Sequence, residues 1–130
     1  MAETGFGIIN YMKKVFLLLA FILSYASLSA QKLKTGTYTF RYCDLEYNSC
    51  VGNCKVVIKG DSIKIYATKK LAKTRTFTKE GDIIDQGIIL QHRSGKWIVG
   101  RSKKDINSND VGGEEGPFII DFIKKEYWRF

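Results

Sequence analysis

The chain has 130 residues, which allows one ordinary domain and excludes a multidomain enzyme. Hydrophobic residues make up 45% of it and aromatic residues 13%, enough apolar surface to offset the entropy of folding, so a disordered chain is excluded. The formal net charge of +8, from 21 Lys and Arg against 13 Asp and Glu, favours attraction to anionic partners.

The first 30 residues have the order of a secretory signal peptide. A basic pair, Lys13-Lys14, precedes the uncharged run Val15–Leu23, and small residues follow up to Ala30. The apolar run is shorter than the ~20 residues that span a bilayer, so we expect cleavage after Ala30, with an uncleaved anchor as the alternative. No Cys follows the small residues, which argues against a lipoprotein. We therefore expect residues 1–30 to be an N-terminal extension and helical signal peptide, and the protein to be periplasmic or secreted.

Residues 31–130 are expected to form a single β domain, because apolar and polar residues alternate with period two along most of it. The expected strands, in chain order, cover 37–42, 54–59, 63–68, 74–79, 83–92, 97–101 and a hairpin within 118–130. Gly60-Asp61, 80–82 and 93–96 are expected turns, and 69–73 is a loop or one helical turn. Gly87 is a candidate bulge.

The predicted fold class is all-β, an antiparallel meander of seven or eight short strands that forms a small barrel or a sandwich. The connections are mostly local, and no βαβ unit is evident. Residues 118–130 could also form a helix, since Phe118 and Phe122 have helical spacing. The Ile, Phe, Tyr and Trp content favours a hairpin instead.

Cys43, Cys50 and Cys54 lie in one short segment, and export favours a disulfide among them. We expect Cys43 to end one strand and Cys54 to begin the next, so that they pair across a loop. Cys50 is then free, with a Cys50–Cys54 bridge as the main alternative. A zinc site is disfavoured because no His or fourth Cys lies nearby.

The strand that opens with Gly36-Thr37-Tyr38 resembles the start of small exported lipocalin-like (calycin-type) β-barrels. That family begins its barrel with Gly-x-Trp and often packs a late Arg against the Trp. By this resemblance Tyr38 takes the place of the Trp and Arg129 that of the late Arg. The resemblance implies a barrel that binds a ligand inside or at its mouth.

Sequence motifs give weak support for catalysis or metal binding. His92 is the single histidine, so any Ser/His or Cys/His pair would have to use it, and we predict no enzyme and no cofactor. Asp105, Asn107 and Asn109 place oxygen ligands at alternate positions, as the start of a calcium loop does. Asp110 and Gly116 stand where the full pattern needs Gly and Glu, so a solvated loop is favoured.

The sequence therefore predicts a non-catalytic exported module that binds a ligand or partner, with anionic envelope or extracellular molecules preferred over nucleic acid. Candidates for anion binding are Lys69, Lys70, Arg93, Lys96 and Arg101. Aromatic candidates for a ligand-lining surface are Tyr38, Phe40, Tyr42, Tyr66, Trp97 and Trp128. The alternative is a protein-interaction or enzyme-inhibitor module that acts through surface loops such as 103–116; a hydrolase is the third possibility.

Overall fold

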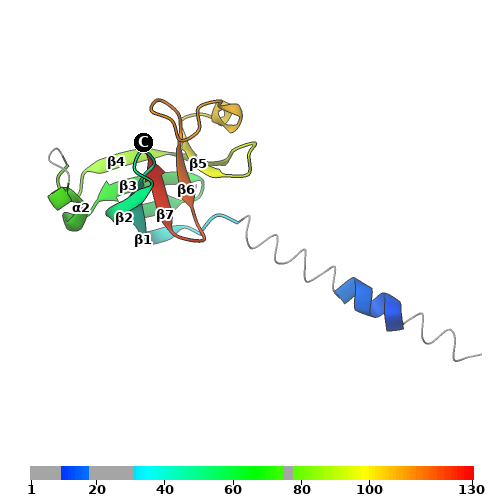
Figure 1. Cartoon of the computed structure of the whole chain (residues 1–130). Coiled ribbons are helices and arrows are strands. Elements are labelled where there is room, and N and C mark those ends of the chain that lie inside the picture. Colours follow the sequence, from blue (N-terminus) through cyan, green and yellow to red (C-terminus); the bar gives the residue numbers. More distant parts are fainter. Residues whose placement is uncertain (1–9, 18–30, 75–77) are drawn as a thin grey trace, which may run out of the picture. The chain divides into compact units, whose positions relative to one another are not determined.

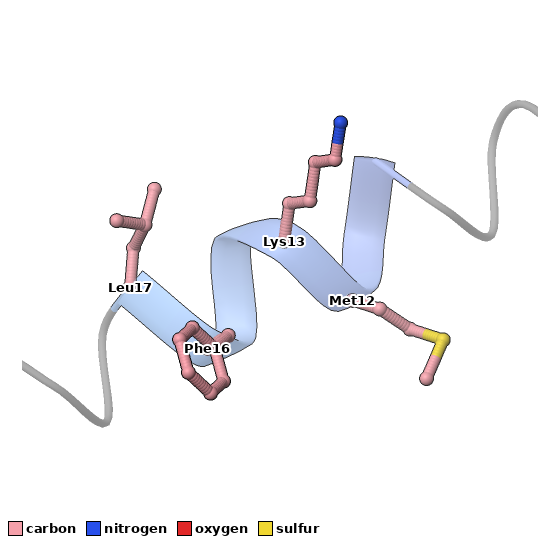
Figure 2. A pocket seen from close by; sticks show the side chains of 4 residues that line it. All are labelled: Met12, Lys13, Phe16 and Leu17. Atoms are coloured by element: carbon pink, nitrogen blue, oxygen red, sulfur yellow. The ribbon is translucent and has the colours of Figure 1, made fainter.

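The computed structural model describes residues 10–17, 31–74 and 78–130, and the chain divides into two units after Gln31. In the first unit residues 10–17 form a helix, and all of its side chains are exposed. Figure 2 shows Met12 and Phe16 on one side of this helix and Lys13 and Leu17 on another, as their i, i+4 spacing requires. No helix among the described residues is long and apolar enough to span a membrane. Most of the predicted signal peptide, including its cleavage point, lies outside the described residues and stays a prediction.

The second unit is a closed barrel of seven strands (Figure 1). The strands are β1 (Gly36–Asp44), β2 (Ser49–Lys59), β3 (Ser62–Ala67), β4 (Ile83–Gln91), β5 (Trp97–Gly100), β6 (Phe118–Asp121) and β7 (Glu126–Arg129). A short helix, α2 (Lys69–Thr74), follows β3, and a 3-10 helix, η1 (Lys103–Asn107), follows β5. The predicted all-β class is confirmed, and the sheet closes as a barrel rather than folding as a sandwich.

Successive strands pair antiparallel, and the barrel closes where β7 pairs with β1 in parallel. Arg41 and Leu45 donate their backbone N–H groups to the carbonyl oxygens of Lys125 and Arg129, both at 2.8 Å. The sheet is therefore mixed. Closure pairs Arg41–Asp44, the second part of β1, with the whole of β7.

The barrel interior is occupied by packed side chains. Period-two alternation sends one face of each strand inward, and the buried cluster comprises Phe40, Tyr42, Cys54, Val56, Ile58, Ile63, Ile65, Ala67, Leu71, Ile89, Val99, Ile120, Phe122 and Tyr127. Leu71, the buried residue of α2, joins this cluster and packs over Gly52 of β2. At Gly87 a Cβ atom would lie 2.2 Å from the carbonyl oxygen of Gly100, so the close approach of β4 to β5 requires glycine there.

Two local expectations about strands are wrong. The predicted bulge at Gly87 is absent, because Gly87 pairs in register with Ile63. The register shift of β4 lies instead at Ile84, which falls between the pairs Ile65–Asp85 and Tyr66–Ile83. Of the predicted strand 74–79, Thr74 ends α2, and residues 78–79 are not in a strand. Residues 75–77 lie outside the described part of the chain. The C-terminal hairpin is confirmed as β6 and β7.

The predicted disulfide pairing is also wrong. Cys43 is bonded to Cys50, and Cys54 is a buried free thiol. The error has one cause, because β2 begins at Ser49 and not at Cys54, so the turn between β1 and β2 has four residues instead of ten. Cys50 therefore stands opposite Cys43, while Cys54 stands opposite Phe40 and points into the core. Burial raises the pKa of the Cys54 thiol to about 12.

This pairing predicts how the three cysteines respond to substitution. Cys54→Ala should retain the disulfide. Its intact mass should therefore be ~2 Da, or two hydrogens, below the mass of the same variant after reduction. The double variant Cys43→Ala/Cys50→Ala should lose about 2–3 kcal/mol of unfolding free energy in urea titrations, the chain-entropy value for so short a loop. Loss of the disulfide in Cys54→Ala would contradict the pairing.

Candidate functional site

A row of outward lysines covers the barrel over β2 and β3. Lys55 and Lys59 are exposed on β2, and Lys64 is exposed on β3 opposite Val57, between them. Helix α2 packs on β2 and carries three further exposed lysines. We call this set the lysine wall; its members are Lys55, Lys59, Lys64, Lys69, Lys70 and Lys73.

The lysine wall is a local excess of charge, not an even scatter. Residues 53–74 contain six lysines and one acid, Asp61. Asp61 is already paired, since Lys32 contacts its carboxylate, and this contact lowers the pKa of Asp61. Residues 53–74 therefore contain no acidic side chain without an ion-pair partner. Such a surface attracts anions and attracts them more strongly at low ionic strength.

The wall also carries an aromatic side chain. Tyr66 is half-buried on β3, and the Nζ atom of Lys55 lies 5.0 Å from the centre of its ring. This cation–π contact orients the lysine on the barrel surface. Sequence reasoning selected Tyr66 and two wall lysines, Lys69 and Lys70, but missed Lys55, Lys59 and Lys64, whose spacing along β2 and β3 becomes informative only with the strand register.

The five predicted anion-binding residues do not form one site. Lys69 and Lys70 lie beside the start of β4, because Ala67 donates a hydrogen bond to the carbonyl oxygen of Asp82. Arg93 and Lys96 are in the turn after the other end of β4 (Figure 1), a separation of roughly 26 Å at 3.3 Å per residue. Arg101 lies after β5 and pairs with Asp85.

The predicted aromatic residues divide between interior and surface. Phe40 and Tyr42 are buried core residues, while Tyr38 and Trp97 pack against the core from its margin. Phe122 links two of them, with ring centres 6.3 Å from Phe40 and 5.6 Å from Trp97. These four candidates for a ligand-lining surface thus belong to the packed core or its margin. The other two predicted aromatic residues lie elsewhere: Tyr66 is on the lysine wall, and Trp128 is half-buried on β7.

The two residues that carried the lipocalin-like resemblance have other partners. The hydroxyl of Tyr38 donates a 2.7 Å hydrogen bond to the carbonyl oxygen of Lys34. Arg129 donates to the carbonyl oxygen of Ile84 at 2.9 Å, and its guanidinium lies 5.2 Å from the ring centre of Phe118. Arg129 therefore stacks on an aromatic ring, as the resemblance implied for a late Arg, but the ring belongs to β6 rather than to β1.

A buried carboxylate, which sequence reasoning missed, lies inside the barrel wall. Asp85 is 3% exposed, and its Oδ2 accepts a 2.7 Å hydrogen bond from the Tyr127 hydroxyl. Its Oδ1 accepts the N–H of Gln86 at 2.8 Å and faces Arg101 Nη2 at 3.3 Å. Burial raises the pKa of Asp85, although Tyr127 and Arg101 oppose that rise; burial and the Asp85 charge also raise the pKa of Tyr127. Because groups of the protein donate hydrogen bonds to both of its carboxylate oxygens, we assign Asp85 a structural role.

His92 is buried and holds a turn. Its Nε2 lies 2.7 Å from the carbonyl oxygen of Ser108. Because that oxygen can only accept, Nε2 carries the hydrogen and donates the hydrogen bond. Nδ1 accepts the Ser94 hydroxyl at 2.8 Å and also the Ser94 backbone N–H at 3.1 Å. Ser94 and His92 are two residues apart in one turn, and these bonds tie that turn to the loop after η1.

Two of the three candidate calcium ligands, Asp105 and Asn109, accept hydrogen bonds from the protein. Asp105 Oδ2 accepts the backbone N–H of Arg101 at 2.7 Å, and Asn109 Oδ1 accepts from Arg93 at 2.6 Å. Ligand atoms of Cys43, Cys50 and Glu126 lie within 4.8 Å of one another. The two sulfur atoms are bonded to each other, however, so neither is a thiolate that could hold a metal ion.

Comparison of the chain with models of protein families, with curated proteins and with solved structures finds no match.

The raised pKa of Asp85 predicts a pH dependence of stability. Between the ordinary pKa of 3.8 and the higher pKa in the folded protein, Asp85 keeps a proton that the unfolded chain releases. The stability that this proton contributes is complete below pH 3.8 and is lost as pH rises through the folded pKa. Wild type should therefore gain stability relative to Asp85→Asn as pH falls from 7 to 4. Urea titrations across that range measure the difference; parallel curves, or the opposite trend, would contradict it.

The Tyr127 hydrogen bond predicts a second effect. Tyr127→Phe removes the donor to a buried carboxylate and should lower the free energy of unfolding by about 1–3 kcal/mol. Tyr38→Phe is the matched control, because it deletes a hydroxyl whose partner is at an exposed site, and it should cost under about 1 kcal/mol. Equal costs for the two variants would show that burial of the bond does not matter.

Proposed function

We propose that this protein is an exported, non-enzymatic binding barrel whose lysine wall holds an acidic polysaccharide of the cell envelope or the extracellular space. The observation that carries the proposal is the wall itself, with its six exposed lysines and one already paired acid on neighbouring elements. The binding surface is the outside of the barrel, since packed side chains occupy the inside.

The wall suits an extended polymer better than a bilayer. Lys55 and Lys59 point the same way from one strand, roughly 13 Å apart at 3.3 Å per residue, and Lys64 is level with the midpoint between them. A chain with regularly spaced anionic groups can meet all three. Helix α2 cannot bury an apolar face in lipid, because its Leu71 is already in the barrel core.

Two further lines support the proposal. The signal-peptide pattern of residues 12–30 favours export, which makes envelope and extracellular polymers more accessible than nucleic acid. The arrangement of His92 and Ser94 is accounted for by their turn, which supports binding over catalysis. In this proposal the lipocalin-like resemblance extends to a closed meander that binds a ligand, with the ligand on the outer wall instead of in the interior.

The proposal predicts that wall lysines matter more than lysines elsewhere. Lys55→Gln/Lys59→Gln/Lys64→Gln should weaken binding to immobilised dextran sulfate or polygalacturonate about threefold or more, at the ~0.2–1 kcal/mol expected of each exposed pair. Binding of wild type should also weaken as NaCl rises from 50 to 300 mM (on the order of a twofold fall in Debye length).

The matched control is Lys96→Gln/Lys104→Gln/Lys124→Gln, which removes the same charge from exposed positions outside the wall. It should leave most of the affinity intact. Equal losses of affinity in the two triple variants would show that binding depends on net charge alone, which would contradict a role for the lysine wall. Tighter binding to anionic phospholipid vesicles than to either polysaccharide would assign the wall to a membrane and overturn the proposal.

A further inference from the structure

The end of the barrel around the turn between β1 and β2 exposes apolar side chains. Tyr47 in that turn is 73% exposed, Val51 on β2 is 44% exposed, and Phe130, just after β7, is 51% exposed. They are three of the five large apolar side chains that are exposed in the described barrel. Exposed aromatic groups gathered at one place are typical of protein–protein contact surfaces.

This end of the barrel is held rigidly. The Cys43–Cys50 disulfide closes the turn, and Asn48 adopts a positive φ of 50° within it. Val51 has no partner on β1, because the register passes from Tyr42–Gly52 to Cys43–Cys50, and this bulge leaves its side chain exposed. A partner would therefore meet a pre-ordered surface and lose less conformational entropy on binding.

A second segment lies against the same turn. Gly112, with a φ of 79°, approaches so closely that a Cβ atom there would lie 3.1 Å from side-chain atoms of both Leu45 and Ile119. Leu45 in turn donates its backbone N–H to the carbonyl oxygen of Arg129 at 2.8 Å. Residues 44–51, loop 108–117 and Phe130 thus form one surface, which we call the tip surface.

The two segments of the tip surface are acidic, in contrast to the protein as a whole, and Arg93 contacts the second of them at Asn109. Residues 44–51 and 108–117 contain five acids and no Lys or Arg, in a chain of net charge +8; the acids are Asp44, Glu46, Asp110, Glu114 and Glu115. The ion pairs among the described residues use none of these five. The tip surface takes in residues 49–51 at the start of β2 and lies against β6, whereas Lys55, Lys59 and Lys64 stand farther along β2 and on β3, so the two surfaces share no residue.

We propose that the tip surface is the docking site for a cationic protein partner, with Tyr47 as its central contact and the surrounding carboxylates as the groups that select Lys and Arg. Aromatic residues ringed by charge are typical of interface centres, and complementary charge fixes the orientation and speeds the encounter. Lysine or arginine side chains of the partner can also stack on Tyr47 or Phe130. Acidic polymers and anionic membranes are repelled here, which keeps this surface separate from the lysine wall.

The test begins with site-specific photo-crosslinking of the full chain in its native host. Tyr47→p-benzoylphenylalanine places the probe in the tip surface. Ile123→p-benzoylphenylalanine is the matched control, because Ile123 is 67% exposed in the turn between β6 and β7. We expect a protein adduct at position 47 that is missing at position 123, and a partner with a basic contact surface. Equal adduct yields at both positions, no protein adduct, or an adduct with a second copy of this chain would overturn the proposal.

The partner identified at position 47 is then purified and its affinity measured by calorimetry. Tyr47→Ala should weaken binding about tenfold, and Ile123→Ala should leave it unchanged. Glu46→Lys should weaken binding severalfold more than Glu80→Lys, an exposed acid outside the tip surface. An unaffected Glu46→Lys variant would overturn the charge argument. None of these changes touches the lysine wall, so polysaccharide binding should persist in every variant, and the two proposals can fail separately.

Discussion

The parallel pairing of β7 with β1 is the constraint on which the rest of the structure depends. It converts a meander of local hairpins into a closed barrel in which each of the seven strands pairs with two neighbours. Once closed, so small a barrel is filled by its own inward side chains, and Leu71 of α2 joins that packing from outside the sheet. The outer wall and the two ends are then the surfaces that remain accessible to another molecule.

Closure also explains the buried polar network. Asp85 occupies an inward position of β4, and its Oδ2 depends on β7 to bring the hydroxyl of Tyr127 to it as a hydrogen-bond donor. Arg101, from the segment after β5, supplies the positive charge. The network thus joins residues that are 42 positions apart in the sequence, and it links the middle of the chain to the strand that closes the barrel.

The sequence was informative wherever one short pattern decided the outcome. Alternation of Val56 and Ile58 with Lys55 and Lys59 predicted the second half of β2, and Gly60-Asp61 predicted the turn after it. It failed where the outcome depended on a partner strand. The length of β2 before Cys54 is set by pairing with β1, so the disulfide was assigned to the wrong residue.

The same limit applies to the candidate sites. An acid at position 85, on the face shared with Ile89, was a signal of a buried carboxylate, but its donors could not be found without the fold. The lysine wall and the tip surface are likewise products of register and loop packing. Lys55 and Lys64 come together through the β2–β3 ladder, and Gly112 meets Leu45 across a long stretch of sequence.

Seven strands have a mechanical consequence. In an up-and-down barrel with an odd number of strands, the first strand begins at one rim and the last strand ends at the other. A pull on the two ends would act along the β1–β7 ladder and load the Arg41–Lys125 and Leu45–Arg129 hydrogen bonds together, in shear, instead of opening them one by one.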